Sequence, residues 1–265
     1  MLSIPNDAAA TYRQQGYYFY RQSVLPPELL DASIQAMDDV RNGVYETGLA
    51  PEDSPWTPGA PLDRLCKIEM PQFANRTIAE IVGHANLGRL AAAITGAQWV
   101  QAWWVQLLIK PSLPPGQSAP TAVGWHQDLQ YWDAWEEDSE LFTAWVALSD
   151  VTIDAGPVRF VPGSHTWGLQ DFGDFYEQNH GDQVLKARVP EGHVWQEEAA
   201  VLPPGGVSFH HKLNMHASGH NTSGHPRRSF AIHLRTEKST PKDGVRQGLA
   251  KHIDDLQKCP VLFGG

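Results

Sequence analysis

Gly124-Trp125-His126-Gln127-Asp128-Leu129-Gln130-Tyr131-Trp132 is the stretch around which the rest of this sequence can be interpreted. Side chains at positions i and i+2 of an extended strand leave the same face, so His126 and Asp128 can present an imidazole nitrogen and a carboxylate oxygen to one metal ion. Alone, this His-x-Asp pattern is a weak signal, because a surface histidine beside a solvated aspartate has the same sequence. A third ligand would complete one face of an octahedron.

His216, in Asn214-Met215-His216-Ala217-Ser218-Gly219-His220-Asn221, is the candidate third ligand. Two histidines and one carboxylate form a facial set that leaves the opposite positions open for a cosubstrate and oxygen. This mixed set favours non-haem Fe(II) over structural zinc, which usually prefers sulfur-rich, closed tetrahedral shells. Of two neighbouring histidines, His211 is kept as a contact to substrate or to the metal ligands, and His210 is interpreted as structural.

Residues 226–235 read as a strand with two different faces. The face formed by Arg227, Ser229, Ala231 and His233 is small or polar, as in a strand that lines a polar cavity. A guanidinium there can bind a carboxylate through two parallel hydrogen bonds, which suits the far end of a dicarboxylate cosubstrate. The alternative is that Arg227 pairs with a surface acid.

The order of these segments resembles the phytanoyl-CoA dioxygenase family, whose members are Fe(II)- and 2-oxoglutarate-dependent oxygenases. The similarity is collinear over roughly residues 10 to 236. The segments that carry it are His126-Gln127-Asp128, Trp145 in Thr143-Ala144-Trp145-Val146-Ala147-Leu148, Pro162-Gly163-Ser164-His165, Phe209-His210-His211, His216-Ala217-Ser218-Gly219-x-Asn221, and Arg227. The resemblance implies a mainly β fold with flanking helices, the double-stranded β-helix or cupin-like jelly roll.

The resemblance also implies a role for each matching residue. His126, Asp128 and His216 match the iron ligands, and Arg227 matches the arginine that binds the distal carboxylate of 2-oxoglutarate. Further positions at which family members contact this cosubstrate are Gln127, Trp145 and Ser218, together with Lys67 and Gln106 on weaker local similarity. O2 is the other implied cosubstrate.

The implied reaction is the hydroxylation of a substrate C–H bond, with oxidative decarboxylation of 2-oxoglutarate to succinate and CO2. Related halogenating enzymes need a vacant ligand position for chloride, so the presence of Asp128 favours hydroxylation. Desaturation, ring formation and epimerisation remain alternatives on the same site. From another class, a non-catalytic jelly-roll protein that binds a metal or a small molecule is the alternative.

A small-molecule substrate is the expected partner. The candidate substrate contacts are Tyr131, Trp132, Trp104 and His211. An aromatic lining suits a hydrophobic, aromatic or cationic substrate, although aromatic residues are also ordinary core material. The sequence shows no basic cluster suited to the phosphates of coenzyme A, which speaks against an acyl-CoA substrate.

Composition narrows the class of protein further. The 265 residues, 42% of them apolar, fit one sizeable domain. A formal net charge of −10 speaks against nucleic-acid or anionic-membrane binding, which need a basic footprint. Two distant cysteines and an N-terminus without a secretory pattern predict a cytoplasmic protein. The sequence does not define an oligomeric state.

Periodicity divides the single oxygenase domain, residues 1–265, into an N-terminal helical part (1–96), a jelly-roll core (97–236) and a C-terminal tail (237–265). Helices are predicted over 7–16, 26–43, 77–82 and 86–95, and strands over 17–20, 99–109, 122–125, 142–148, 158–161, 207–211 and 228–235. The Pro- and Gly-rich loop 43–62 either covers the mouth of the site or is a surface excursion. The aromatic insert 163–199 either forms a pocket wall or caps the core.

Overall fold

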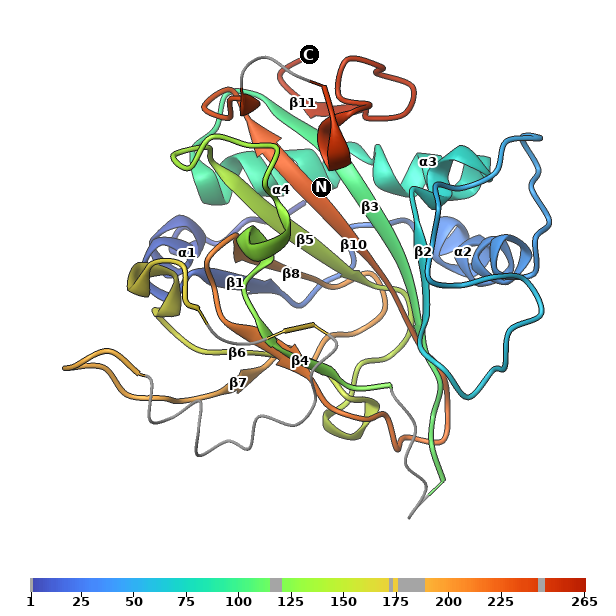
Figure 1. Ribbon diagram of the computed structural model, residues 1–265, viewed down its shortest axis with the longest axis horizontal. Coiled ribbons are helices and arrows are strands. Elements are labelled where there is room, and N and C mark those ends of the chain that lie inside the picture. Colours follow the sequence, from blue (N-terminus) through green and yellow to red (C-terminus); the bar gives the residue numbers. More distant parts are fainter. Residues whose placement is uncertain (1, 115–120, 172–173, 176–188, 243–245) are drawn as a thin grey trace.

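The computed structural model describes residues 2–114, 121–171, 174–175, 189–242 and 246–265. Two antiparallel β-sheets form its centre, and helices lie beside the larger sheet (Figure 1). In the described part of the chain, the α-helices are α1 (Ala8–Gln15), α2 (Pro27–Arg41), α3 (Arg76–Val82) and α4 (Ala85–Thr95). The 3-10 helices are η1 (Pro71–Phe73), η2 (Asp128–Tyr131), η3 (Ile153–Ala155), η4 (Ser164–Trp167) and η6 (Gly248–Ala250).

The larger sheet has the strand order β1-β8-β5-β10-β3-β11, with β2 also paired to β3. The smaller sheet has the order β4-β9-β6-β7. The strands are β1 (Tyr17–Tyr20), β2 (Cys66–Glu69), β3 (Val100–Lys110), β4 (Val123–His126), β5 (Leu141–Ala147), β6 (Val158–Phe160), β7 (Glu198–Ala199), β8 (Val207–His211), β9 (His216–Ser218), β10 (Arg227–Thr236) and β11 (Val261–Phe263). This is the jelly roll with flanking helices that the family resemblance implies.

The four predicted helices agree with the structure to within a few residues, because their start and stop signals are local. Pro27 occupies the first turn of α2, where its missing N–H costs no hydrogen bond. Gly96 ends α4 in the left-handed conformation, with φ of +76°. The buried face of α4, which includes Leu87 and Leu90, belongs to the apolar cluster that contains the outer face of the large sheet.

The central strand β10 pairs with β3 on one side and β5 on the other. Phe230, Ile232 and Leu234 belong to the apolar cluster shared with the helices. Arg227, Ala231 and His233, on the opposite face, line a cavity between the sheets. The predicted division of this strand into an apolar face and a small or polar face is therefore confirmed.

Four strands, β2, β7, β9 and β11, were not expected from the sequence. Each has four residues or fewer, and the pattern of so short a segment does not distinguish a strand from a loop. β11 falls in the expected tail and pairs with β3. In the described part of the chain, no helix combines the length and the apolar character that crossing a membrane requires.

Loop 43–62 is fastened to the body of the protein. Trp56 Nε1 donates a 2.9 Å hydrogen bond to the carbonyl of Arg41, and Glu52 pairs with Lys251 and His252 at 2.6 Å each. The residues that line the cavity between the sheets include none from this loop. The structure thus favours the surface excursion over the lid.

Candidate active site

A cavity of about 200 Å³ lies between the two sheets. Strands β2, β3, β5, β8 and β10 of the large sheet contribute lining residues, and so do β4, β6 and β9 of the small sheet. Side chains alternate along a strand, and in β3 every second residue, Trp104, Gln106 and Leu108, accordingly faces the cavity. The candidate metal ligands and Arg227 line this same space.

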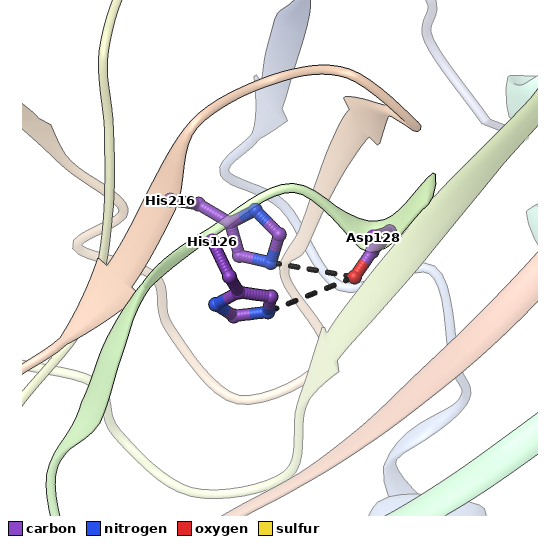
Figure 2. A group of neighbouring side chains, drawn as sticks. All are labelled: His126, Asp128 and His216. Carbon is purple, nitrogen blue, oxygen red and sulfur yellow. Dashed lines mark ion pairs between the residues drawn. The ribbon is translucent and has the colours of Figure 1, made fainter. Parts of the chain in front are cut away.

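His126, Asp128 and His216 converge at one wall of the cavity (Figure 2). The two histidines lie directly opposite each other on the antiparallel strands β4 and β9. Asp128 opens η2, but the intervening Gln127 is extended, with φ of −116° and ψ of 134°, so the alternation continues past the end of β4. Asp128 Oδ1 lies 3.8 Å from His126 Nε2 and 3.6 Å from His216 Nε2. These three ligand atoms lie within 4.8 Å of one another, so one ion can contact all three.

The backbone sets the tautomer of both histidines. His126 Nδ1 lies 2.8 Å from the carbonyl of Gly124, and His216 Nδ1 lies 2.9 Å from the carbonyl of Asn214. A carbonyl only accepts, so each Nδ1 carries the hydrogen and each Nε2 keeps its lone pair. Burial lowers the pKa of both imidazoles, most strongly that of His216, which keeps them neutral. A neutral imidazole with a free Nε2 is the form that binds a metal ion.

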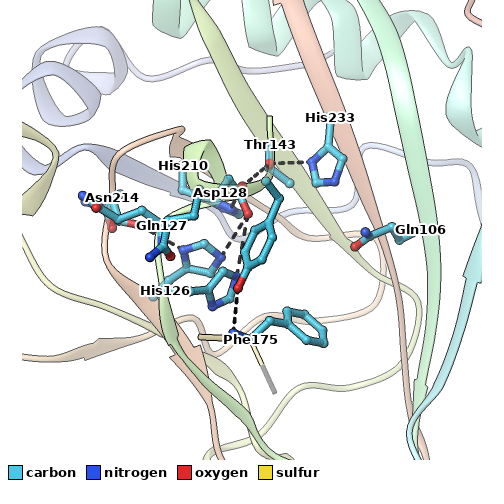
Figure 3. Close-up of polar contacts among 12 residues, drawn as sticks. Gln106, His126, Gln127, Asp128, Thr143, Phe175, His210, Asn214 and His233 are labelled. Atoms are coloured by element: carbon cyan, nitrogen blue, oxygen red, sulfur yellow. Dashed lines mark hydrogen bonds and ion pairs between the residues drawn. The ribbon is translucent and has the colours of Figure 1, made fainter. Parts of the chain in front are cut away.

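The second oxygen of Asp128 is held by the protein (Figure 3). Thr143 Oγ1 donates to Oδ2 at 2.7 Å, and His210 Nε2 lies 3.1 Å from the same oxygen. Thr143 in turn lies 2.8 Å from Nδ1 of His233. Burial alone would raise the pKa of the Asp128 carboxyl, but the ring of His216 and the hydrogen bond from His210 outweigh it and hold this pKa well below its usual range. Asp128 therefore offers a metal one ionised oxygen, Oδ1.

His210 and His211 exchange the places expected from sequence. His210 lines the cavity and contacts Asp128, whereas His211 lies on the other face of β8, with its ring centroid 5.5 Å from that of His165. Burial lowers the pKa of His211 to about 3. The expectation that His211 contacts the substrate or the metal ligands is therefore corrected. His210 is the histidine that contacts a metal ligand, Asp128.

Arg227 lies at the other end of the cavity. Its guanidinium carbon is 5.0 Å from the ring centroid of Trp145, and Nη1 donates to the carbonyl of Gly156. Gly156 has φ of +64°, and a Cβ there would lie 2.6 Å from the carbonyl oxygen of Gly219. The close approach of these two backbone segments therefore requires glycine at position 156.

The charge of Arg227 has no partner of opposite sign in the described part of the chain, where no carboxylate lies within ion-pair distance of it. Its Nε has no hydrogen-bond partner there either, although the side chain is 2% exposed. Burial lowers its pKa to about 9. Within the described residues Arg227 therefore does not pair with a surface acid, and its orphaned Nε donor fits an anionic ligand such as a carboxylate.

Gln127 does not line the cavity, contrary to its expected contact with the cosubstrate. Its Nε2 donates to the carbonyls of Gly168 at 2.9 Å and Leu213 at 2.7 Å, and its Oε1 accepts from the N–H of Gln170 at 2.7 Å. The alternation that places His126 and Asp128 inward turns Gln127 the other way. In this structure its side chain joins three backbone segments.

A polar cluster occupies the cavity wall formed by β2 and β3. Lys67, Trp104 and Gln106 line the cavity and meet at the buried carboxylate of Glu69, which sequence reasoning missed. Trp104 Nε1 donates to Glu69 at 2.6 Å, Lys67 Nζ lies 3.3 Å away and Gln106 Nε2 lies 3.4 Å away. Lys67 and Glu69 share one face of β2, so recognition of this strand would have revealed the pair.

Aromatic and apolar side chains complete the cavity. Tyr131 and Trp132 follow the metal ligands along the chain and line the cavity with Phe175 and Leu249. The hydroxyl of Tyr131 accepts a 2.8 Å hydrogen bond from the N–H of Phe175. Among the described residues of the insert 163–199, Phe175 thus lines the cavity. Trp167 and Trp195 instead pack against an apolar cluster, and Phe172 and Tyr176 lie outside the described residues.

The fold and this donor set are those of the non-haem iron, 2-oxoglutarate-dependent oxygenases. The family model described as phytanoyl-CoA dioxygenase (PhyH) matches residues 12–229. The chain belongs to this family, as its motif order indicates.

The chain is similar in sequence to one family member of a nematode. A curated relative, a probable phytanoyl-CoA dioxygenase of Caenorhabditis elegans, is 31% identical over 143 residues, which are 50% of this chain and 44% of the relative. This chain therefore matches less than half of that relative's length.

Among solved structures, the carbocyclase SnoK of nogalamycin biosynthesis has a TM-score of 0.72 at 22% identity, covering 98% of this chain and 97% of its own. The epimerase SnoN of the same biosynthesis has a TM-score of 0.66 at 21% identity, over 88% of this chain and 83% of its own. EvdO2 from Micromonospora carbonacea has a TM-score of 0.63 at 19% identity, over 91% and 94%. At these identities the similarity shows the shared fold.

The hydrogen bond from Thr143 to Asp128 gives a first testable prediction. Replacing Thr143 with valine keeps the size of the side chain but removes the donor, and we expect Fe(II) affinity to fall roughly 10- to 100-fold. Competition with a coloured chelator measures this affinity. Thr236→Val is the matched control, because that buried strand hydroxyl donates to Glu140, outside the cavity lining. Equal Fe(II) affinity in wild type and Thr143→Val would show that the hydrogen bond does not support the ligand.

Proposed function

We propose that the protein is an Fe(II)- and 2-oxoglutarate-dependent dioxygenase that hydroxylates a C–H bond of a small organic molecule, with succinate and CO2 as coproducts. One observation carries the proposal. A single cavity holds two neutral imidazoles and one ionised carboxylate oxygen at one end. At the other end it holds a buried guanidinium that has no carboxylate partner in the described part of the chain. A binding module has no need for both an open metal face and a carboxylate clamp.

Each residue has a task in this reaction. His126 Nε2, His216 Nε2 and Asp128 Oδ1 would hold Fe(II), and Arg227 would hold the distal carboxylate of 2-oxoglutarate. Bound iron supplies the oxidising chemistry with O2 and this cosubstrate. Because Thr143 and His210 occupy Asp128 Oδ2, the carboxylate would have only Oδ1 to offer a metal, and other positions of the metal would stay open. The ring of Trp145 orients the guanidinium and shields it from water.

The cavity wall indicates the class of substrate. Trp104, Tyr131, Trp132 and Phe175 provide an aromatic surface beside the metal ligands, and the charges of Lys67 and Glu69 offset each other. Among the described residues that line the cavity, Lys67 is the only lysine and Arg227 the only arginine. A largely apolar or aromatic molecule with a polar group fits this lining better than the phosphates of coenzyme A do.

An anaerobic titration tests the proposal. The metal-free protein receives Fe(II) and then 2-oxoglutarate, while visible absorption is followed for the charge-transfer band of the chelated cosubstrate. The band is expected in the wild type, and the same preparation then allows a substrate screen by succinate release. The absence of the band, with iron bound loosely or not at all, would contradict the proposal. Product analysis separates hydroxylation from desaturation, ring formation and epimerisation.

A further inference from the structure

Lys110 is a buried lysine next to the Arg227 end of the cavity. It is the last residue of β3 and pairs directly with Arg227 of β10. The side chain is fully buried and does not line the cavity. Its Nζ donates to Ser218 Oγ at 2.6 Å, to the carbonyl of Gly219 at 2.6 Å and to the carbonyl of Ser218 at 3.3 Å. All three acceptors are uncharged.

The charge of this region is unbalanced. Lysine is almost never fully buried without a partner of opposite charge. In the part of the chain that the structure describes, no carboxylate lies within ion-pair distance of Lys110 or Arg227. Burial, and then the neighbouring Arg227 and Arg159, hold the pKa of Lys110 well below its usual range. Two buried basic side chains thus lie side by side, and an anion placed near them would relieve the repulsion between their charged forms.

Ser218 connects Lys110 to the cavity. Its side chain lines the cavity, and Oγ accepts the hydrogen bond from the lysine. An ammonium group has no lone pair, so the serine hydroxyl cannot donate back to it. The hydroxyl proton of Ser218 is left for another acceptor, and a ligand carboxylate beside Arg227 would supply one.

We propose that Lys110 is a positioning residue that determines cosubstrate specificity: through Ser218 it directs a hydroxyl donor toward the distal carboxylate, and with Arg227 it makes the site select a dicarboxylate. This inference rests on the proposed function. Lys110 itself stays outside the cavity and acts through Ser218 and through its charge. The competing explanation is that Lys110 only fastens the 218–219 backbone, and so supports β9 and His216.

Two cosubstrate analogues distinguish these explanations. 2-Oxoglutarate and 2-oxobutyrate share the metal-chelating 2-oxo acid, and 2-oxobutyrate lacks the distal carboxylate. Their dissociation constants are measured anaerobically with Fe(II) from the charge-transfer band. In Lys110→Met we expect 2-oxoglutarate affinity to fall roughly 10- to 100-fold, 2-oxobutyrate affinity to change less than about twofold, and Fe(II) affinity to remain the same. A residue that only fastens the backbone would weaken both acids equally, or weaken Fe(II).

The chain offers a matched control in Lys212. It is also buried, and its Nζ donates to the backbone carbonyls of Glu137 and Ser139, away from the cavity lining. Lys212→Met should leave the ratio of the two affinities unchanged. Lys110→Gln keeps a hydrogen-bond donor for Ser218 but removes the charge, and it replaces Lys110→Met if that variant does not fold. Its ratio of 2-oxoglutarate to 2-oxobutyrate affinity is expected to lie between those of the wild type and Lys110→Met.

Ser218→Ala provides an independent check. If Lys110 acts through the hydroxyl, Lys110→Met should weaken 2-oxoglutarate less in the Ser218→Ala background than in the wild type. An unchanged affinity ratio in folded Lys110→Met or Lys110→Gln would overturn the inference while the wild-type band still supported the proposed function. A wild type without the band would contradict the proposed function itself.

Discussion

Replacing His216 with alanine is expected to abolish Fe(II) retention and to lower turnover by at least about a thousandfold, equivalent to about 4 kcal/mol. His216 lies opposite His126 across the β4–β9 pair, and its Nε2 points to the carboxylate oxygen that the other imidazole also faces. Two donors on adjacent positions hold a divalent ion far less firmly than three, and they no longer define an open face. Iron content after gel filtration and succinate release measure the two effects.

Suitable controls separate loss of a ligand from loss of packing. The ring of His216 packs near Phe160, so His216→Gln, which keeps part of the volume, accompanies the alanine variant. His220→Ala changes a histidine that contacts Thr121 and lies outside the cavity lining, and it should retain iron. His210→Ala should weaken Fe(II) binding without abolishing it, because it removes one of two donors to Asp128 Oδ2. Iron retained by His216→Ala and lost by His220→Ala would refute the choice of ligands.

The parts of the site that could be predicted from sequence depend on local periodicity. His126 and Asp128 share a face because the backbone stays extended between them, and Arg227 and His233 share the cavity face of β10 for the same reason. The motif order added the long-range pairing with His216. Local rules, and the order of motifs that resembles the family, were sufficient for these residues because neither depends on details of packing.

The sequence contains a pattern that would have assigned His210 and His211 correctly. Val207 and Phe209 belong to the apolar cluster, which leaves Ser208 and His210 for the opposite face of β8. The polar phase of that strand therefore identifies His210 as the inward residue, just as the polar phase of β10 identifies Arg227. His211 lies on the same face of β8 as Val207 and Phe209, at the end of the strand, where its ring packs against His165.

Other features depend on contacts between distant segments, which no local pattern encodes. Glu69 is recognisable as part of the cavity only after β2 is placed beside β3, where Trp104 and Gln106 meet it. Thr143 is an ordinary strand residue until β5 brings it to Asp128. Lys110 becomes unusual only when β3 and β10 set it opposite Arg227 with no nearby acid in the described part of the chain.

The second large effect is expected at the other end of the cavity. Arg227→Ala should lower the affinity for 2-oxoglutarate roughly 100- to 1,000-fold, because a guanidinium–carboxylate pair with two parallel hydrogen bonds is lost from a buried site. Fe(II) affinity should be unchanged, since Arg227 is not among the metal ligands. The charge-transfer titration reports the dissociation constant directly. Arg227→Lys should recover part of the affinity, because an ammonium supplies the charge without the planar fork.

The neighbouring residue is the control for this change. Arg228 points to the opposite face of β10, where it forms two 3.0 Å hydrogen bonds with Asp38, so Arg228→Ala removes a hydrogen-bonded arginine from the same strand. We expect Arg228→Ala to affect stability and leave 2-oxoglutarate affinity unaltered. If Arg227→Ala bound the cosubstrate as tightly as the wild type, or if both variants lost affinity equally, the orphaned guanidinium would not be the carboxylate clamp. The contrast between two adjacent arginines thus tests the strand alternation from which the site was first inferred.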